Sequence, residues 1–87
     1  MVWNRKTQLI IDYFNLIVNS DIVLVANYTK RGIDGYIGAN TLMEIGMALY
    51  HNKLIYLMND VPDMQYKEEI LACNPIILKG DLNKIVS

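Results

Sequence analysis

Three short runs of uninterrupted apolar residues stand out along this chain, at residues 22–26, 54–58 and 76–78. Apolar runs of this length without polar alternation are typical of strands in a parallel sheet, which are buried on both faces. The pattern therefore predicts three strands, and it predicts that residues 22–26 are buried on both faces.

Between these runs the apolar residues recur at helical spacing, which predicts helices over residues 6–19, 40–51 and 65–73. Asp81 can cap a last helical turn through residue 86. Strands that alternate with helices favour a small α/β fold, a three-layer flavodoxin-like or Rossmann-like sheet of about three parallel strands flanked by helices. Because the pattern begins with a helix, it corresponds to such a fold without its first strand and helix. A sheet this narrow leaves an apolar edge open unless something covers it.

The loop at residues 27–38 is the first place to look for function. It is rich in glycine, tyrosine and charge, and Gly32 and Gly35 are available for positive φ. Loops that follow parallel strands lie at the carboxyl edge of the sheet, where α/β proteins bind ligands. Glu44 would lie one turn into the next helix, close to that edge.

Composition indicates a single domain, residues 1–87, with unusually much apolar surface for its size. Of these residues 53% are apolar, and the mean hydropathy is +0.18. No run approaches the ~20 apolar residues that span a bilayer, so no membrane partner is expected. The N-terminus does not resemble a signal peptide, which favours a cytoplasmic location. We expect the excess apolar surface to be covered by another copy of the chain, in a homodimer or a larger homo-oligomer.

The net charge and the small number of histidine and cysteine residues argue against a nucleic-acid partner and against a metal site. Eight basic against nine acidic residues leave a net charge of −1, so no nucleic-acid partner is expected. Lys30 and Arg31 could touch one phosphate, although two charges in a loop are usually only solvated. The single cysteine, Cys73, fits a reducing compartment and a buried, inert thiol. One histidine and one cysteine give no metal-ligand spacing, so neither a metal site nor a cofactor is predicted.

A spaced motif surrounds the second predicted helix. Its residues are Thr41, Glu44, Gly46 and Ala48, followed by Lys53 before the second apolar run. Together with residues 22–27 and the tail around residues 66–82, this motif resembles the nucleoside 2-deoxyribosyltransferase-like superfamily. That group includes deoxyribosyltransferases and deoxynucleotide N-glycosidases. The resemblance covers about residues 8–81 and corresponds to the later part of a typical member.

The resemblance implies a ligand and a chemistry. Glu44 would be the nucleophile that attacks the anomeric carbon of a 2′-deoxyribosyl group and expels the base, as in a retaining glycosidase. A helix N-terminus would favour its ionised form. The small-molecule partner would be a nucleoside or nucleotide. The implied substrate-binding residues are Asn27, Asp34, Tyr36, Gly38, Asn40 and Thr41.

Two features depart from the family pattern. Tyr13 stands where the family commonly has an aspartate, and the opening strand and loop of the family have no counterpart before Met1. A pocket built from this chain alone would lack one wall and its general acid.

Structural interpretations of the same residues remain open. Thr41 and Glu44 also fit a capping box, in which the glutamate folds back onto the helix start. Asp34 could simply form a turn, and Tyr36 could pin the loop onto the core. Gly46 would allow close packing on a strand, and Met43 would fill the core. The chain is therefore an enzyme, a nucleotide-binding module without catalysis, or an oligomerisation module.

Overall fold

The computed structural model describes residues 4–85, and it contains the predicted elements in the predicted order. Helix and strand ends lie within two residues of those expected, and the end of the last turn, at residue 86, lies outside the described residues. The elements are α1 (Arg5–Val18), β1 (Ile22–Val25), α2 (Ala39–Tyr50), β2 (Leu54–Leu57), α3 (Lys67–Ala72), β3 (Ile76–Ile77) and the 3-10 helix η1 (Leu82–Lys84).

The three strands form one parallel sheet in the order β1-β2-β3. Ile22 pairs with Leu54 at one end of β1, and Tyr56 of β2 pairs with Ile76 of β3. The predicted α/β fold with three parallel strands flanked by helices is confirmed. This topology puts the loops after β1 and β2 at one edge of the sheet, as expected.

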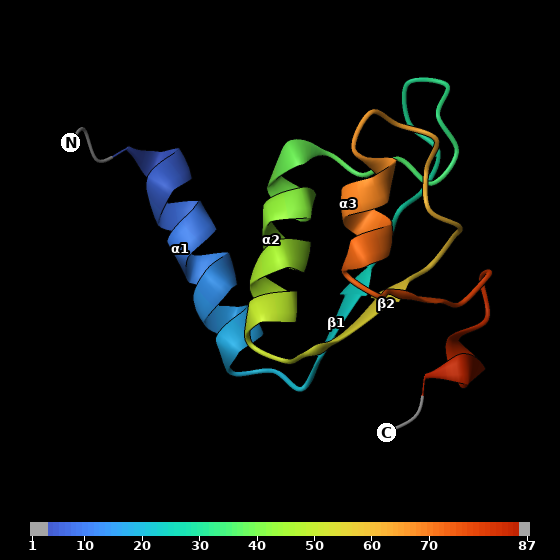
Figure 1. Ribbon diagram of the computed structural model, residues 1–87. Coiled ribbons are helices and arrows are strands. Elements are labelled where there is room, and N and C mark those ends of the chain that lie inside the picture. The colour runs from blue at the N-terminus through green and yellow to red at the C-terminus, as the bar shows by residue number, and fades with distance from the viewer. Residues whose placement is uncertain (1–3, 86–87) are drawn as a thin grey trace.

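The helices form a row in front of the sheet (Figure 1). Helix α2 packs on both β1 and β2, and α1 packs on α2. Figure 1 shows β1 and β2 in the gap between α2 and α3 and below α3, whereas α1 stands on the other side of α2 with no strand behind it. The core lies between the sheet and these helices. Its buried members are Ile17, Val25, Ile37, Ile45, Ala48, Ile55, Leu57 and Ile70.

The prediction that β1 is buried on both faces is wrong. Val25 belongs to the core, but Ile22 and Leu24 point to the other face and are 36% and 43% exposed. Tyr56, on the same face of β2, is buried. This second face is therefore covered at β2 and open at β1. The predicted open apolar edge is present, because β1 is an edge strand.

Two predictions for α2 are also wrong. Met43 is 44% exposed and does not fill the core. A side chain at Gly46 would meet nothing within 4 Å, so close packing does not explain this glycine. The physical reason is the rotation of the helix, which turns Ile45 and Ala48 toward the sheet and leaves Met43 and Gly46 outside.

Three further predictions concern membrane-spanning helices, metal binding and the single cysteine. Within residues 4–85, no helix has both the length and the apolar character needed to cross a bilayer. The same residues hold no group of histidine, cysteine and carboxylate side chains that could bind a metal ion. Cys73 is half-buried against the core, and burial raises the pKa of its thiol, which disfavours the reactive thiolate.

Candidate functional site

Three adjoining cavities border the first half of α2, and we call them together the α2 cleft. Their volumes are about 540, 330 and 380 Å³. The first lies against α1, the second runs along β1, and the third lies at the start of α2. Side chains shared between the cavities join them, and six residues each line two: Lys6, Tyr13, Tyr36, Asn40, Thr41 and Glu44.

Glu44 is the carboxylate of the α2 cleft. It lies beyond the first turn of α2, which begins at Ala39, and it lines both the cavity against α1 and the cavity along β1. Partial burial raises the pKa of its carboxyl above the ordinary value. The predicted lowering by the helix terminus is therefore wrong, because that effect fades within one turn and desolvation acts in the opposite direction.

The capping-box interpretation of Thr41 and Glu44 is also wrong. The N-cap of α2 is Gly38, which has no side chain to accept a hydrogen bond, and Thr41 already lies inside the helix. The glutamate is therefore not used at the helix start. The first N–H groups of α2 have no side-chain acceptor from their N-cap residue.

Basic side chains gather around this helix start. Lys6 of α1 and Lys30 of the loop line the third cavity with Gly38 and Asn40. The Nζ of Lys30 lies 5.7 Å from the centre of the Tyr36 ring, and the guanidinium carbon of Arg31 lies 5.9 Å from it. Cations beside uncapped helix N–H groups favour an anionic ligand. This end of the α2 cleft is suited to a phosphate group.

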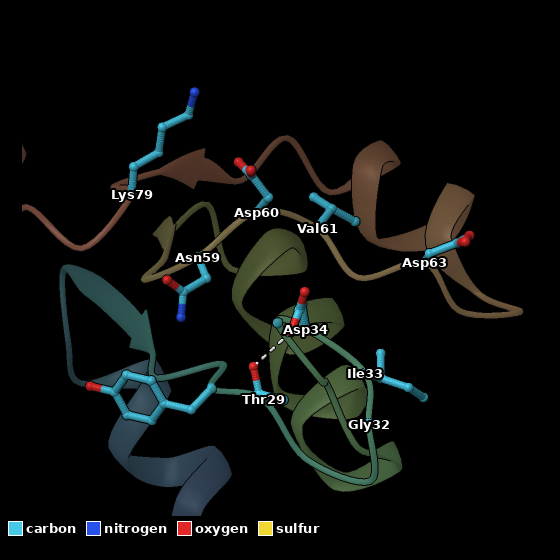
Figure 2. A pocket seen from close by; sticks show the side chains of 11 residues that line it. Thr29, Gly32, Ile33, Asp34, Asn59, Asp60, Val61, Asp63 and Lys79 are labelled. Carbon is cyan, nitrogen blue, oxygen red and sulfur yellow. Dashed lines mark hydrogen bonds between the residues drawn. The ribbon is translucent and has the colours of Figure 1, made fainter.

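A second, separate cleft of about 810 Å³ lies where β1 and β2 end (Figure 2). Figure 2 shows Lys79 and Asp60 above the loop that carries Thr29 and Asp34, with Asp63 at the right of the view. Asp34 enters this cleft from the glycine-rich loop, where its carboxylate accepts a hydrogen bond of 2.9 Å from the Thr29 hydroxyl. Asp34 therefore organises its own loop, and it does not line the α2 cleft.

The side chain of Asn27 is buried and bonds two loops at this edge of the sheet, the loop after β1 and the loop after β2. We call this set of hydrogen bonds the Asn27 clamp. The Asn27 side chain is 2% exposed. Its amide nitrogen lies 3.2 Å from the carbonyl oxygen of Gly35, 3.0 Å from that of Asn59 and 3.3 Å from that of Asp60. Its amide oxygen accepts a hydrogen bond of 2.9 Å from the Asn59 N–H. These contacts give Asn27 a positioning role beneath the clefts.

Replacing Asn27 with alanine is expected to destabilise the fold by about 2 kcal/mol, because the Asn59 N–H and the loop carbonyl groups lose their buried partner. Urea unfolding monitored by circular dichroism measures this change. The control is Thr29→Ala, which removes an exposed side-chain hydrogen bond and should cost well under 1 kcal/mol. Equal losses in the two variants would contradict the clamp role.

The structure thus brings most of the predicted site residues together. Tyr36, Gly38, Asn40, Thr41 and Glu44 border the α2 cleft, Asp34 borders the other cleft, and Asn27 lies beneath both loops. Sequence reasoning did not assign Lys6 to the site. The sequence feature that could have assigned Lys6 to the site is its helical spacing with Ile10 and Tyr13, which puts these side chains on one side of α1.

Comparisons of the chain with protein-family models, with curated proteins and with solved structures gave no match.

Proposed function

We propose that this chain binds a nucleoside or deoxynucleotide in the α2 cleft and that Glu44 faces the sugar. The observation that carries the proposal is the shared cleft itself. Glu44 and Thr41, from the motif, border the same cleft as the basic helix start with Lys6 and Lys30. A carboxylate beside the sugar and an anion-binding helix start for the phosphate match the order of these two groups in a nucleoside 5′-monophosphate.

The chemistry proposed for this complex is cleavage of the N-glycosidic bond, as the resemblance to deoxyribosyltransferases and N-glycosidases implies. A carboxylate oxygen of Glu44 forms a bond to the anomeric carbon while the bond from that carbon to the base nitrogen breaks. The base leaves with the bonding electrons and takes a proton from water, because the described lining of the cleft holds no second carboxyl group. Water or a second base then forms a bond to the anomeric carbon while its bond to the glutamate oxygen breaks, which gives the free sugar with water and a new nucleotide with a base.

A catalytically inactive binding module is the alternative, and one observation favours it. Retaining glycosidases use two carboxyl groups. Among the described residues that line the α2 cleft, Glu44 is the single carboxylate. Tyr13, at the position where the family has an aspartate, lines the same two cavities as Glu44. A protein that bound the nucleotide without cleaving it would fit this alternative.

Calorimetric titration tests the proposed ligand. We expect a deoxynucleoside 5′-monophosphate to bind at least about tenfold more tightly than the same deoxynucleoside, because a charge-assisted phosphate contact contributes about 1.4 kcal/mol or more. Lys6→Gln should reduce this preference. The matched control is Lys79→Gln, which removes a lysine from the second cleft and should leave the preference unchanged. Equal affinity for both ligands would contradict the proposed orientation.

We further propose that copies of the chain associate through the solvent face of α2. Met43, Gly46 and Tyr50 follow one another along this face, with Leu49 beside them, and the Tyr50 side chain is 82% exposed. Because Gly46 has no side chain, a second helix can approach this apolar face closely. Light scattering during size-exclusion chromatography should give a multiple of the chain mass, and Tyr50→Glu should return the mass to that of one chain.

A further inference from the structure

The free edge of β1 carries backbone groups that have no hydrogen-bond partner among residues 4–85. In the described part of the chain, β1 pairs only with β2. The carbonyl oxygen of Val25 accepts a hydrogen bond of 2.9 Å from the Met58 N–H, so Val25 and, by alternation, Val23 face β2. Successive residues of a strand direct their N–H and C=O groups to opposite edges. Ile22 and Leu24 therefore direct theirs away from the sheet.

Helix α1 covers the space beside this edge. The cavity of about 330 Å³ that runs along β1 is lined on its other side by Tyr13, Leu16 and Ile17 of α1. The Leu16 side chain is 63% exposed, although it lies in an apolar stripe of the helix. A strand placed one ladder spacing of about 4.8 Å beyond β1 would lie beneath this stripe. It would cover the part of α1 that has no strand behind it in Figure 1.

Nothing on β1 opposes such pairing. Edge strands in soluble proteins commonly carry lysine, proline or a bulge that blocks addition of another strand. The residues from Ile22 to Ala26 include no charge and no proline, and the ladder with β2 runs through β1 without a bulge.

A second copy cannot occupy this edge through its own β1. Antiparallel pairing of the two β1 strands about a two-fold axis keeps the helices of both copies on one side of the sheet. Packed helices lie 8–10 Å apart, about two strand spacings. The α2 of the second copy, which packs over its own β1 and β2, would then fall where α1 of the first copy lies. The space accepts a strand that brings no helix of its own.

We infer that the groove between α1 and β1 accepts one extended, uncharged strand from a partner polypeptide, which pairs with the backbone of Ile22 and Leu24. This strand carries apolar side chains on both faces, because one face meets Tyr13 and Leu16 and the other lies beside the exposed side chains of β1. Main-chain hydrogen bonds supply the recognition, as in other cases of strand addition. The strand also adds a wall next to Glu44, which lines the same cavity.

A tethered strand tests this inference on the full chain. The probe is a short valine- and leucine-rich strand with a lysine at each end, joined to the N-terminus by a flexible glycine–serine linker, which raises its effective concentration to the millimolar range. Amide hydrogen exchange by NMR is the measurement. We expect exchange at Ile22 and Leu24 to slow about tenfold or more on tethering, since their N–H groups gain partners. Val23 and Val25 already face β2 and should change much less.

Two proline variants provide a matched control. Leu24→Pro removes an N–H that faces away from β2, so the fold should persist while protection at Ile22 by the tethered strand disappears. Val23→Pro removes an N–H that faces β2 and should destabilise the sheet itself. The inference is overturned if tethering leaves exchange at Ile22 and Leu24 unchanged, or if Leu24→Pro retains the protection. It is also overturned if the untethered chain is a dimer in which both amides are already protected. None of these readouts depends on nucleotide binding, so failure here is distinguishable from failure of the proposed function.

Discussion

Glu44→Gln is expected to reduce the proposed N-glycosidic cleavage by at least about 10³-fold, with the fold and nucleotide binding preserved. An uncharged amide of nearly the same size cannot attack the anomeric carbon, so no glycosyl-enzyme ester forms. Release of free base from a deoxynucleoside 5′-monophosphate, followed by chromatography, measures the loss. Mass spectrometry should find the deoxyribosyl adduct on Glu44 of the wild type and no adduct in the variant.

The same substitution has a pH-dependent effect on stability. Burial raises the pKa of the Glu44 carboxyl above its ordinary value of 4.5, so the folded chain holds this proton more tightly than the unfolded chain. The resulting stabilisation is complete below the unfolded pKa and is lost as the pH rises through the folded pKa. Glutamine has no proton to lose, so the variant should gain stability relative to the wild type as the pH rises through that range. Urea unfolding at pH 4 and pH 7 measures the difference.

The control for both experiments is Glu68→Gln, which removes an exposed carboxylate from α3, away from the α2 cleft. This variant should retain the wild-type rate. Retained cleavage in Glu44→Gln would remove this glutamate from the mechanism. Absence of cleavage in the wild type, together with tight nucleotide binding, would instead establish the inactive binding module.

Gly35→Ala is expected to destabilise the fold by about 3 kcal/mol or more. Gly35 adopts a φ of +69°, where a side chain is unfavourable, and an added Cβ would overlap the carbonyl oxygen of Asp60. It would also lie 3.2 Å from the amide nitrogen of Asn27. Because Asn27 bonds both loops, a shift of either loop to make room would weaken the clamp. Thermal and urea unfolding should both show the loss.

Gly32→Ala separates backbone strain from this overlap. Gly32 has a similar φ of +73°, but an added Cβ there would meet nothing within 4 Å. Its cost should be limited to the backbone preference, about 1–2 kcal/mol. If the two alanine variants lost the same stability, the close approach of Gly35 to Asp60 would have no energetic role.

Local pattern was enough to predict the elements of this fold. The apolar runs at β1, β2 and β3 and the helical spacing in α1 and α2 depend on neighbours a few residues apart, which the chain alone specifies. The positive φ predicted for Gly32 and Gly35 is confirmed for the same reason, since it reflects the lack of a Cβ. The parallel order also followed, because each pair of adjacent strands is separated by a helix.

The tertiary structure decided what these elements face. An apolar run predicted burial on both faces of β1, but burial depends on whether another element covers each face. Among residues 4–85, the second face is left partly open at Ile22 and Leu24. The capping box at Glu44 was overturned because the helix begins earlier, at Ala39, and burial then decided the direction of the pKa shift. The hydrogen bonds of Asn27 and the place of Lys6 in the α2 cleft both depend on residues more than 30 positions away in the sequence. Local periodicity carries no information about such distant neighbours, so only the packed chain determines the surroundings of each site residue.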